Sequence, residues 1–191
     1  MNVEFQNISS QHIRNCFLKA YEGFPELHRH RLIVQQQPMR TTTMQAQPVV
    51  NLAFFRQRKR HYIIRLSDNI HLREQVRVHE LPEEVLIGWF AHELGHVIDY
   101  LPRTALGLLK FGIGYLMHPN FRIGAERKAD IYAIAHGFAD FVIATKKYIL
   151  EKSNLPNRYK SRIERYYMSA DEVVLLVQKQ EKEQLRMDTL I

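Results

Sequence analysis

The chain has 191 residues and a mass of 22.7 kDa, a size typical of one domain that can bury a substantial core. Apolar residues make up 46% of it and charged residues 25%, which excludes collagen-like, disordered and low-complexity classes. A single cysteine, Cys16, excludes an intramolecular disulfide framework and gives no sign of an oxidising compartment.

The net charge of +7 comes from the first third of the chain. Residues 1–66 hold 10 Lys and Arg against 3 Asp and Glu, whereas the remaining residues hold 17 of each kind. The excess peaks in the segment Arg56–Arg60, a candidate site for an acidic partner or a nucleic acid. A solvated turn between two strands is the interpretation we favour, because the segment is small beside the contact area of a DNA-binding protein.

The first residues contain no basic segment followed by an apolar one, and no run of about 18 apolar residues occurs in the chain. We therefore expect neither a secretory signal nor a transmembrane segment. Together with the single cysteine, this favours a cytoplasmic location.

One helix and a small sheet are expected in the first third of the chain. Residues 9–22 are predicted to be helical, because Ser9 or Ser10 can cap the start and apolar residues recur at spacings of three and four. The segment that follows is rich in β-branched and aromatic residues. Within it, Val49–Phe55 and His61–Leu66 flank the basic turn and are expected to pair as a hairpin.

Helices are expected to dominate the rest of the chain. One is predicted from Pro82 to about Tyr100, because proline suits the first helical turn and two glutamates follow it at the positive end of the helix dipole. Residues 103–117 are apolar but contain three glycines, and we assign no structure to them. Core or a cleft wall is favoured for them over a membrane-surface role. Ser169–Glu172 has the pattern of a capping box that opens the last helix. Further helices are expected over residues 121–136 and 138–152.

The most informative segment is His92-Glu93-Leu94-Gly95-His96, which lies within the predicted 82–100 helix. Two histidines at positions i and i+4 share one helix face, so their imidazoles can bind one zinc ion per chain. Glu93 is rotated about 100° from the first ligand and is too far round to bind the ion itself. It can instead reach a water held at the open zinc position. Zinc lowers the pKa of such a water to about 7, and Glu93 can take its proton.

A third ligand must come from another segment. Position 102 is proline, which excludes the zincin class that carries a third histidine there. The downstream candidates are Glu126, Asp130, His118 and His136. Glu126 and Asp130 share one helical face, so one carboxylate can bind zinc while the other hydrogen-bonds the free N–H of a zinc-bound histidine. We favour Glu126 as the ligand.

Taken together, His92-Glu93-x-x-His96 and Glu126-x-x-x-Asp130 resemble the gluzincin metallopeptidases. The pattern is most similar to the compact minigluzincins and to the soluble part of the prenyl-protease-like membrane peptidases. The resemblance implies zinc binding by His92, His96 and Glu126. It also implies Glu93 as the general base and Asp130 as the residue that orients a ligand histidine.

The resemblance covers residues 80–136 and implies an α+β, zincin-like fold. Its elements are an N-terminal helix, a small and mostly antiparallel sheet, an active-site helix, a glutamate helix and C-terminal helices. We expect residues 1–191 to form a single domain, with 155–191 as a helical extension. The segment Glu126-x-x-Ala129-x-x-x-Ala133 is also similar to one in bacterial regulator-cleaving metallopeptidases, which leaves the subfamily open.

Peptide hydrolysis also needs a hydrogen-bond donor for the oxyanion that develops on the substrate. His118, in a predicted loop just before the glutamate helix, is our candidate catalytic residue for this role. The other candidates are Tyr115, Arg127, Tyr132 and His136. An extended substrate can pair with an exposed sheet edge, for which Tyr62–Leu66 or Val49–Phe55 would serve.

We therefore expect a zinc-dependent endopeptidase that hydrolyses peptide bonds with a metal-activated water. Two alternatives are a non-proteolytic zincin-like module that regulates or binds a partner, and a basic nucleic-acid-associated metalloprotein. The presence of Glu93 favours an enzyme over a regulatory module. A purely structural zinc site normally closes its fourth position with another protein ligand, and no fourth Cys or His is spaced to do so. The nucleic-acid alternative would need basic residues close to the cleft.

Overall fold

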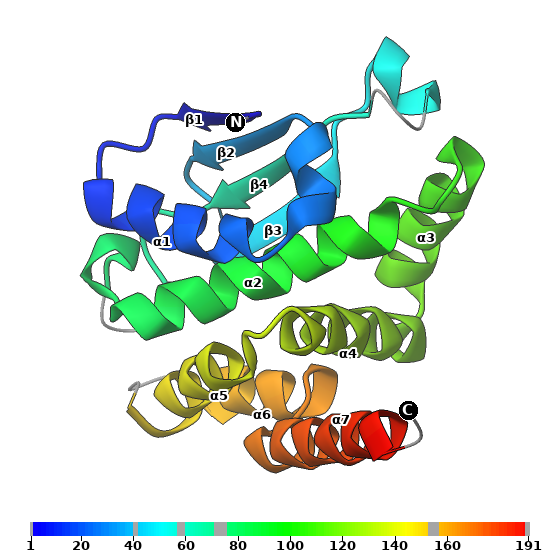
Figure 1. The fold of residues 1–191 in the computed structure, drawn as a ribbon. Helices are drawn as coiled ribbons and strands as arrows, with labels where there is room; N and C mark the ends of the chain where they lie inside the picture. The colour runs from blue at the N-terminus through cyan, green and yellow to red at the C-terminus, as the bar shows by residue number, and fades with distance from the viewer. Residues whose placement is uncertain (1, 40–41, 57–59, 71–75, 153–156, 190–191) are drawn as a thin grey trace.

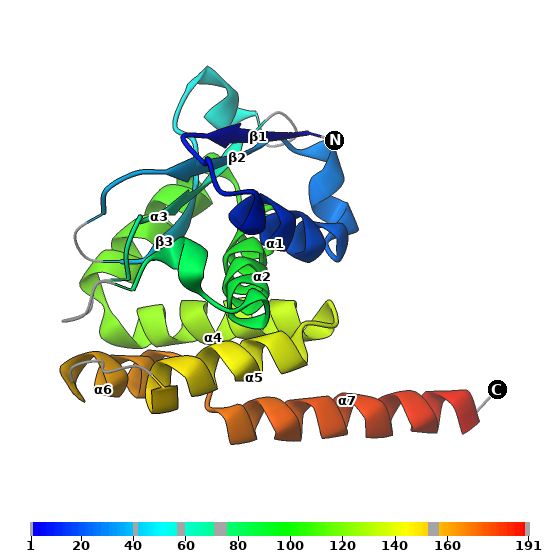
Figure 2. The ribbon, with the colours of Figure 1, turned by 90° about the vertical axis from the view of Figure 1, so that its left-hand side faces the viewer.

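A computed structural model describes residues 2–39, 42–56, 60–70, 76–152 and 157–189. It is an α+β protein, as predicted, in which a sheet lies on one side of a stack of helices (Figures 1 and 2). Next to the sheet are α1 (Gln11–Glu22) and α2 (Glu83–Tyr100), followed by α4 (Pro119–Ala135), with α3 (Ala105–Met117) at one end. Beyond α4 lie α5 (Ala139–Lys147), α6 (Asn157–Tyr166) and α7 (Ala170–Thr189). Within the described residues, no helix is both long and apolar enough to cross a bilayer.

The sheet is mixed, so the expectation of a mostly antiparallel sheet is wrong. The predicted N-terminal helix is present as α1, but β1 precedes it in the chain. The strand order of the sheet is β1-β2-β4-β3, with β1–β2 and β2–β4 parallel and β3–β4 antiparallel. The strands are β1 (Val3–Gln6), β2 (Leu32–Gln36), β3 (Met44–Pro48) and β4 (Tyr62–Leu66). The physical reason is the connection through α1: a helical crossover returns the chain in the same direction and makes β1 and β2 parallel.

The predicted strand Val49–Phe55 is also wrong. The strand that pairs with β4 is β3, with Ala46 opposite Ile64. Leu52–Phe55 forms a short 3₁₀ helix, capped by the side-chain oxygen of Asn51, which accepts the N–H of Ala53 at 2.9 Å. Of the six apolar side chains in Val49–Phe55, three are exposed and only Phe54 is buried, so they do not form the buried face that a strand would need.

Helix starts follow their predicted signals closely. Pro82 is the N-cap of α2, and the Ser10 hydroxyl accepts the N–H of Ile13 at the start of α1. At α7, the Glu172 N–H donates to Ser169 Oγ at 3.1 Å, and the Ser169 N–H donates to Glu172 Oε2 at 2.7 Å. This reciprocal pair confirms the capping box. The helix predicted over 121–136 is α4, the one over 138–152 begins with α5, and the unassigned apolar stretch is α3.

The central element is α2, which is buried nearly all round. It packs against α1 and β3 on one side and against α4 and α5 on the other. Glycine permits the close approach: a Cβ on Gly95 would lie 2.4 Å from the carbonyl oxygen of Ala129 in α4. A Cβ on Gly88 would lie 2.1 Å from the carbonyl oxygen of Phe141 in α5. These two contacts set the distance between α2 and the helices that complete the site.

Candidate metal centre

The structure brings together the three predicted metal ligands. His92 and His96 project from one face of α2 toward Glu126 on α4, and all three side chains are buried. Glu126 Oε2 lies 3.1 Å from His92 Nε2 and 3.4 Å from His96 Nε2. One ligand atom from each residue falls within 4.8 Å of the others. The cluster can therefore hold a metal ion.

The chemistry of the donor set fits a transition metal. Two imidazole nitrogens and one carboxylate oxygen suit zinc and its neighbours in the first transition series better than calcium or magnesium. The His96 Nδ1 is buried without a hydrogen-bond partner, so the ring is not held by its far nitrogen. The other ring nitrogen, Nε2, is directed at the carboxylate of Glu126, so one ion could bind both groups.

Asp130 orients one of these ligands. It accepts the N–H of His92 Nδ1 at 2.9 Å, which leaves Nε2 directed toward Glu126. The other carboxylate oxygen of Asp130 accepts from Lys146 Nζ at 2.8 Å and from the Met168 N–H at 3.1 Å. The role predicted for Asp130 requires this contact, because such a hydrogen bond would fix the tautomer and orientation of a metal-binding histidine.

Charges at the cluster are strongly coupled. Burial disfavours the imidazolium form of His92, but hydrogen bonds to Asp130 and Glu126 outweigh burial and raise its pKa to about 10. Burial alone would raise the pKa of Glu126, yet the positive charge of His96 and the hydrogen bond from His92 hold it well below its usual range. Without metal, a proton on His92 therefore occupies the place that an ion would take.

Metal affinity is expected to rise with pH. An ion needs the neutral Nε2 of His92, so binding below the raised pKa of about 10 must displace a proton. Because proton and metal compete, lower pH weakens binding, and affinity should rise about tenfold per pH unit on the acid side of that pKa. Calorimetric titration with zinc, in two buffers of different ionisation enthalpy, should report release of about one proton near neutral pH. An affinity that does not change between pH 7 and about 9 would contradict this assignment.

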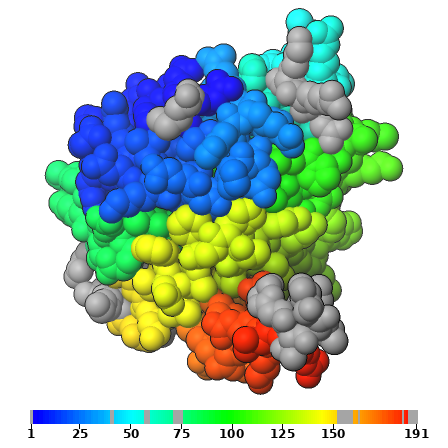
Figure 3. All heavy atoms as spheres, in the orientation of Figure 1, coloured from blue at the N-terminus to red at the C-terminus, as the bar shows by residue number. Residues whose placement is uncertain are grey.

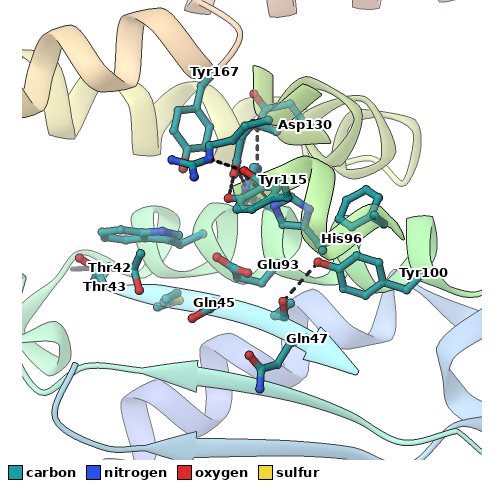
Figure 4. A pocket seen from close by; sticks show the side chains of 18 of the residues that line it. Thr42, Thr43, Gln45, Gln47, Glu93, His96, Tyr100, Tyr115, Asp130 and Tyr167 are labelled. Carbon is teal, nitrogen blue, oxygen red and sulfur yellow. Dashed lines mark hydrogen bonds and ion pairs between the residues drawn. The ribbon is translucent and has the colours of Figure 1, made fainter. Parts of the chain in front are cut away.

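Glu93 lies beside the cluster without belonging to it. In Figure 4 its carboxylate points from α2 into the space above β3. The side chain is buried, and burial raises its pKa despite the opposing charges of His96 and His92. A buried carboxylate next to the ligands, with a pKa moved toward neutrality, has the properties of a general base that later returns its proton.

A cavity of about 780 Å³ is lined by His92, Glu93, His96, Glu126 and Asp130. One wall is β3, where residues 42–48 line the cavity (Figure 4). A second wall is α3, which confirms that the apolar 105–117 stretch lines a cleft. Residues of α5 also line the cavity, as do Ile163 and Tyr167 around α6.

Neither segment predicted to offer an exposed sheet edge lies at an edge of the sheet. Tyr62–Leu66 is β4, an interior strand with a neighbour on each side, and Val49–Phe55 contains no strand. The edge strands of the described sheet are β1 and β3, and β3 borders the cavity. The Tyr100 hydroxyl on α2 donates to the carbonyl of Ala46 at 3.3 Å, which holds this edge against α2.

His118 is not brought to the site. It is exposed at the junction of α3 and α4, outside the residues that line the cavity. Its backbone N–H donates to the carbonyl of Gly114 and so caps α3. The cause is local: Pro119 starts α4 directly after it and leaves no loop that could reach the cavity.

The other predicted oxyanion donors differ in position. Tyr115 lines the cavity, and its hydroxyl donates to Glu126 Oε1. Arg127 pairs with Glu172 at 2.9 Å, away from the ligands. Tyr132 and His136 do not line the cavity either, and the His136 ring stacks on Phe24. Tyr115 is therefore the candidate that the fold brings into contact with a ligand.

Two residues at the site had no signal in the sequence. Lys146 is buried against Asp130, and its ammonium lies 5.2 Å from the ring centre of Tyr167. The Tyr167 ring centre is 5.3 Å from that of His92. Lysine and tyrosine side chains are common on helix surfaces, and no spacing connects these positions to the histidine motif. Only the tertiary fold places them together.

The basic segment is smaller than the sequence indicated. Arg60 is buried: its Nε donates to the carbonyl of Phe54 at 3.1 Å and its Nη1 to the carbonyl of Arg103 at 2.9 Å. Residues 57–59 lie outside the described residues. Arg60 thus joins the turn to the start of α3 and does not lie in a solvated turn.

Comparison of the chain with protein-family models, with curated proteins and with solved structures finds no match. What the site can do is therefore inferred from its own residues.

Proposed function

We propose that the protein is a zinc-dependent endopeptidase of the gluzincin type, with a zincin-like fold. One observation supports this most. A buried cluster of His92, His96 and Glu126 has the Glu93 carboxylate beside it, in a cavity bordered by a sheet edge. A peptidase needs a metal site, a general base and a place for the peptide, whereas a purely structural metal site needs neither the base nor the cavity.

The ligand set favours a catalytic centre over a structural one. Two histidines and one glutamate leave the fourth position of a tetrahedral ion open. Among the described residues, the cluster contains no further His, Cys, Asp or Glu that would close it. When bound, zinc would supply a Lewis acid that polarises the peptide carbonyl and lowers the pKa of a water to about 7.

The surrounding side chains divide the remaining work. Glu93 takes the proton from the attacking water and passes it to the amine that leaves. Tyr115, with its hydroxyl at Glu126, is the donor that we assign to the developing oxyanion in place of His118. Asp130 keeps the His92 imidazole in the tautomer that presents Nε2 to the ion.

Substrate binding is assigned to the edge of β3. Within the described sheet this strand pairs only with β4, and its other side borders the cavity, where the Ala46 carbonyl already accepts from the Tyr100 hydroxyl. An extended peptide can add there as a further strand, because main-chain hydrogen bonds do not depend on the peptide's side chains. The apolar wall formed by α3 then favours substrates with apolar residues beside the cleaved bond.

The test is cleavage by protein of known metal content. Protein purified without chelator should contain about one zinc per chain and cleave members of a broad peptide library at neutral pH. Removal of zinc with a chelator should abolish cleavage, and added zinc should restore it. His96→Ala, prepared in parallel, should contain no zinc and remain inactive. Zinc-loaded protein that leaves every peptide intact would instead favour the partner-binding module.

A further inference from the structure

An apolar stripe on α3 is exposed at the border of the cavity, since three of its residues, Leu109, Ile113 and Leu116, also line the cavity. Leu106, Leu109, Ile113, Leu116 and Met117 are each at least 50% exposed. They recur at spacings of three and four, so they form one continuous helix face. Large apolar side chains gathered in this way mark an interaction surface, whereas scattered ones need no explanation.

The segment 50–55 extends the same surface. Val50, Leu52 and Phe55 are between 71% and 91% exposed. Arg60 joins this segment to α3, since it donates to the carbonyls of both Phe54 and Arg103. Figure 3 shows the segment as a projection at the upper right, with α3 beside it. We call these eight exposed side chains the apolar corner.

The sequence segments that contain the apolar corner carry positive charge. The sequence segments 42–67 and 100–125, which contain it, together include eight Lys and Arg and no Asp or Glu. Of these, Arg56 follows the 3₁₀ helix and Lys110 lies one turn from Leu106, and both are exposed. Protruding aliphatic side chains beside cations form the composition that binds the interface of an anionic lipid bilayer.

We propose that the apolar corner docks on an anionic membrane surface. The apolar side chains enter the region between headgroups and acyl chains, while Arg56 and Lys110 remain at the level of the lipid phosphates. A second copy of the chain is a poorer partner, because a symmetric contact would bring two basic surfaces together. Exposed leucine, isoleucine and methionine also differ from the Trp, Tyr and Arg anchors that dominate protein interfaces.

The proposal is tested by vesicle flotation of the full chain. Vesicles of phosphatidylcholine with phosphatidylserine should carry the protein, pure phosphatidylcholine should carry far less, and added salt should weaken binding. The double substitution Leu52→Asp with Leu106→Asp should reduce partitioning about tenfold or more. Neither residue lines the cavity, so peptide cleavage in solution should not change.

The matched control is Ile131→Asp with Leu175→Asp. Both residues are exposed and lie on α4 and α7. The two substitutions change the net charge by the same amount as Leu52→Asp with Leu106→Asp. Equal loss in both double variants, or no binding to anionic vesicles, would overturn the proposal. A concentration-dependent dimer that is lost only in the first variant would overturn it in favour of self-association. Flotation requires neither metal nor substrate, so this result is separate from that of the peptidase test.

Discussion

Glu93→Gln is expected to abolish peptide hydrolysis while zinc content stays at its original level. Glutamine has nearly the shape of glutamate but cannot accept a proton at neutral pH. The loss of general-base help should reduce kcat by roughly 10²–10⁴-fold or more, since the carboxylate also positions the water. Because Glu93 is outside the ligand cluster, zinc affinity should change little. The measurements are kcat on one cleaved library peptide and zinc per chain.

Glu126→Gln provides the contrast, because the same change of atoms falls on a ligand. A neutral amide beside a divalent cation replaces an anion, so this variant should lose zinc as well as activity. Hydrolysis at the original rate by zinc-loaded Glu93→Gln would show that another group accepts the proton. Equal zinc loss in both variants would show that Glu93 is itself a ligand.

Gly95→Ala is expected to destabilise the protein by about 3 kcal/mol and to weaken metal binding with it. The added Cβ would lie 2.4 Å from the Ala129 carbonyl oxygen, so α2 and α4 must separate. Gly95 lies between the two histidine ligands, and Ala129 lies between Glu126 and Asp130. Separation therefore moves the carboxylates away from the imidazoles. Urea denaturation of the metal-free protein and zinc titration measure the two effects.

The control is Gly124→Ala, also within a helix. A Cβ there meets no atom within 4 Å, so alanine should stabilise α4 by up to about 1 kcal/mol. If Gly95→Ala unfolds at the same urea concentration as the original protein and binds zinc equally well, the close contact of the two helices is not what holds the ligands together.

Local signals predicted the helices and the ligand cluster. A histidine pair four residues apart fixes its own geometry once the segment is helical, and Pro82 with two following glutamates marked that helix. The spacing of Glu126 and Asp130 predicts that they share a helix face, but it does not predict that this face packs against α2. The contact of Gly95 with Ala129 places that face against α2.

Long-range pairing was beyond the sequence pattern. β1 is four residues long, too short for a period-two signal, and without it the parallel order of the sheet cannot be derived. Apolar composition favoured Val49–Phe55 as a strand, yet only Phe54 of its apolar side chains is buried, and the strand is Met44–Pro48. His118 failed as a catalytic candidate because a loop was expected where Pro119 begins a helix directly.

Asp130 accepts hydrogen bonds from three segments that are far apart in the chain: His92, Lys146 and the backbone of Met168. A ribosome releases residues in order, so a nascent chain carries all three metal ligands while two of these donors are still unmade. These hydrogen bonds are complete only after the chain has been synthesised as far as Met168 and has folded back against Asp130. Metal captured before Met168 is in place would therefore enter a pocket in which Asp130 lacks part of its support.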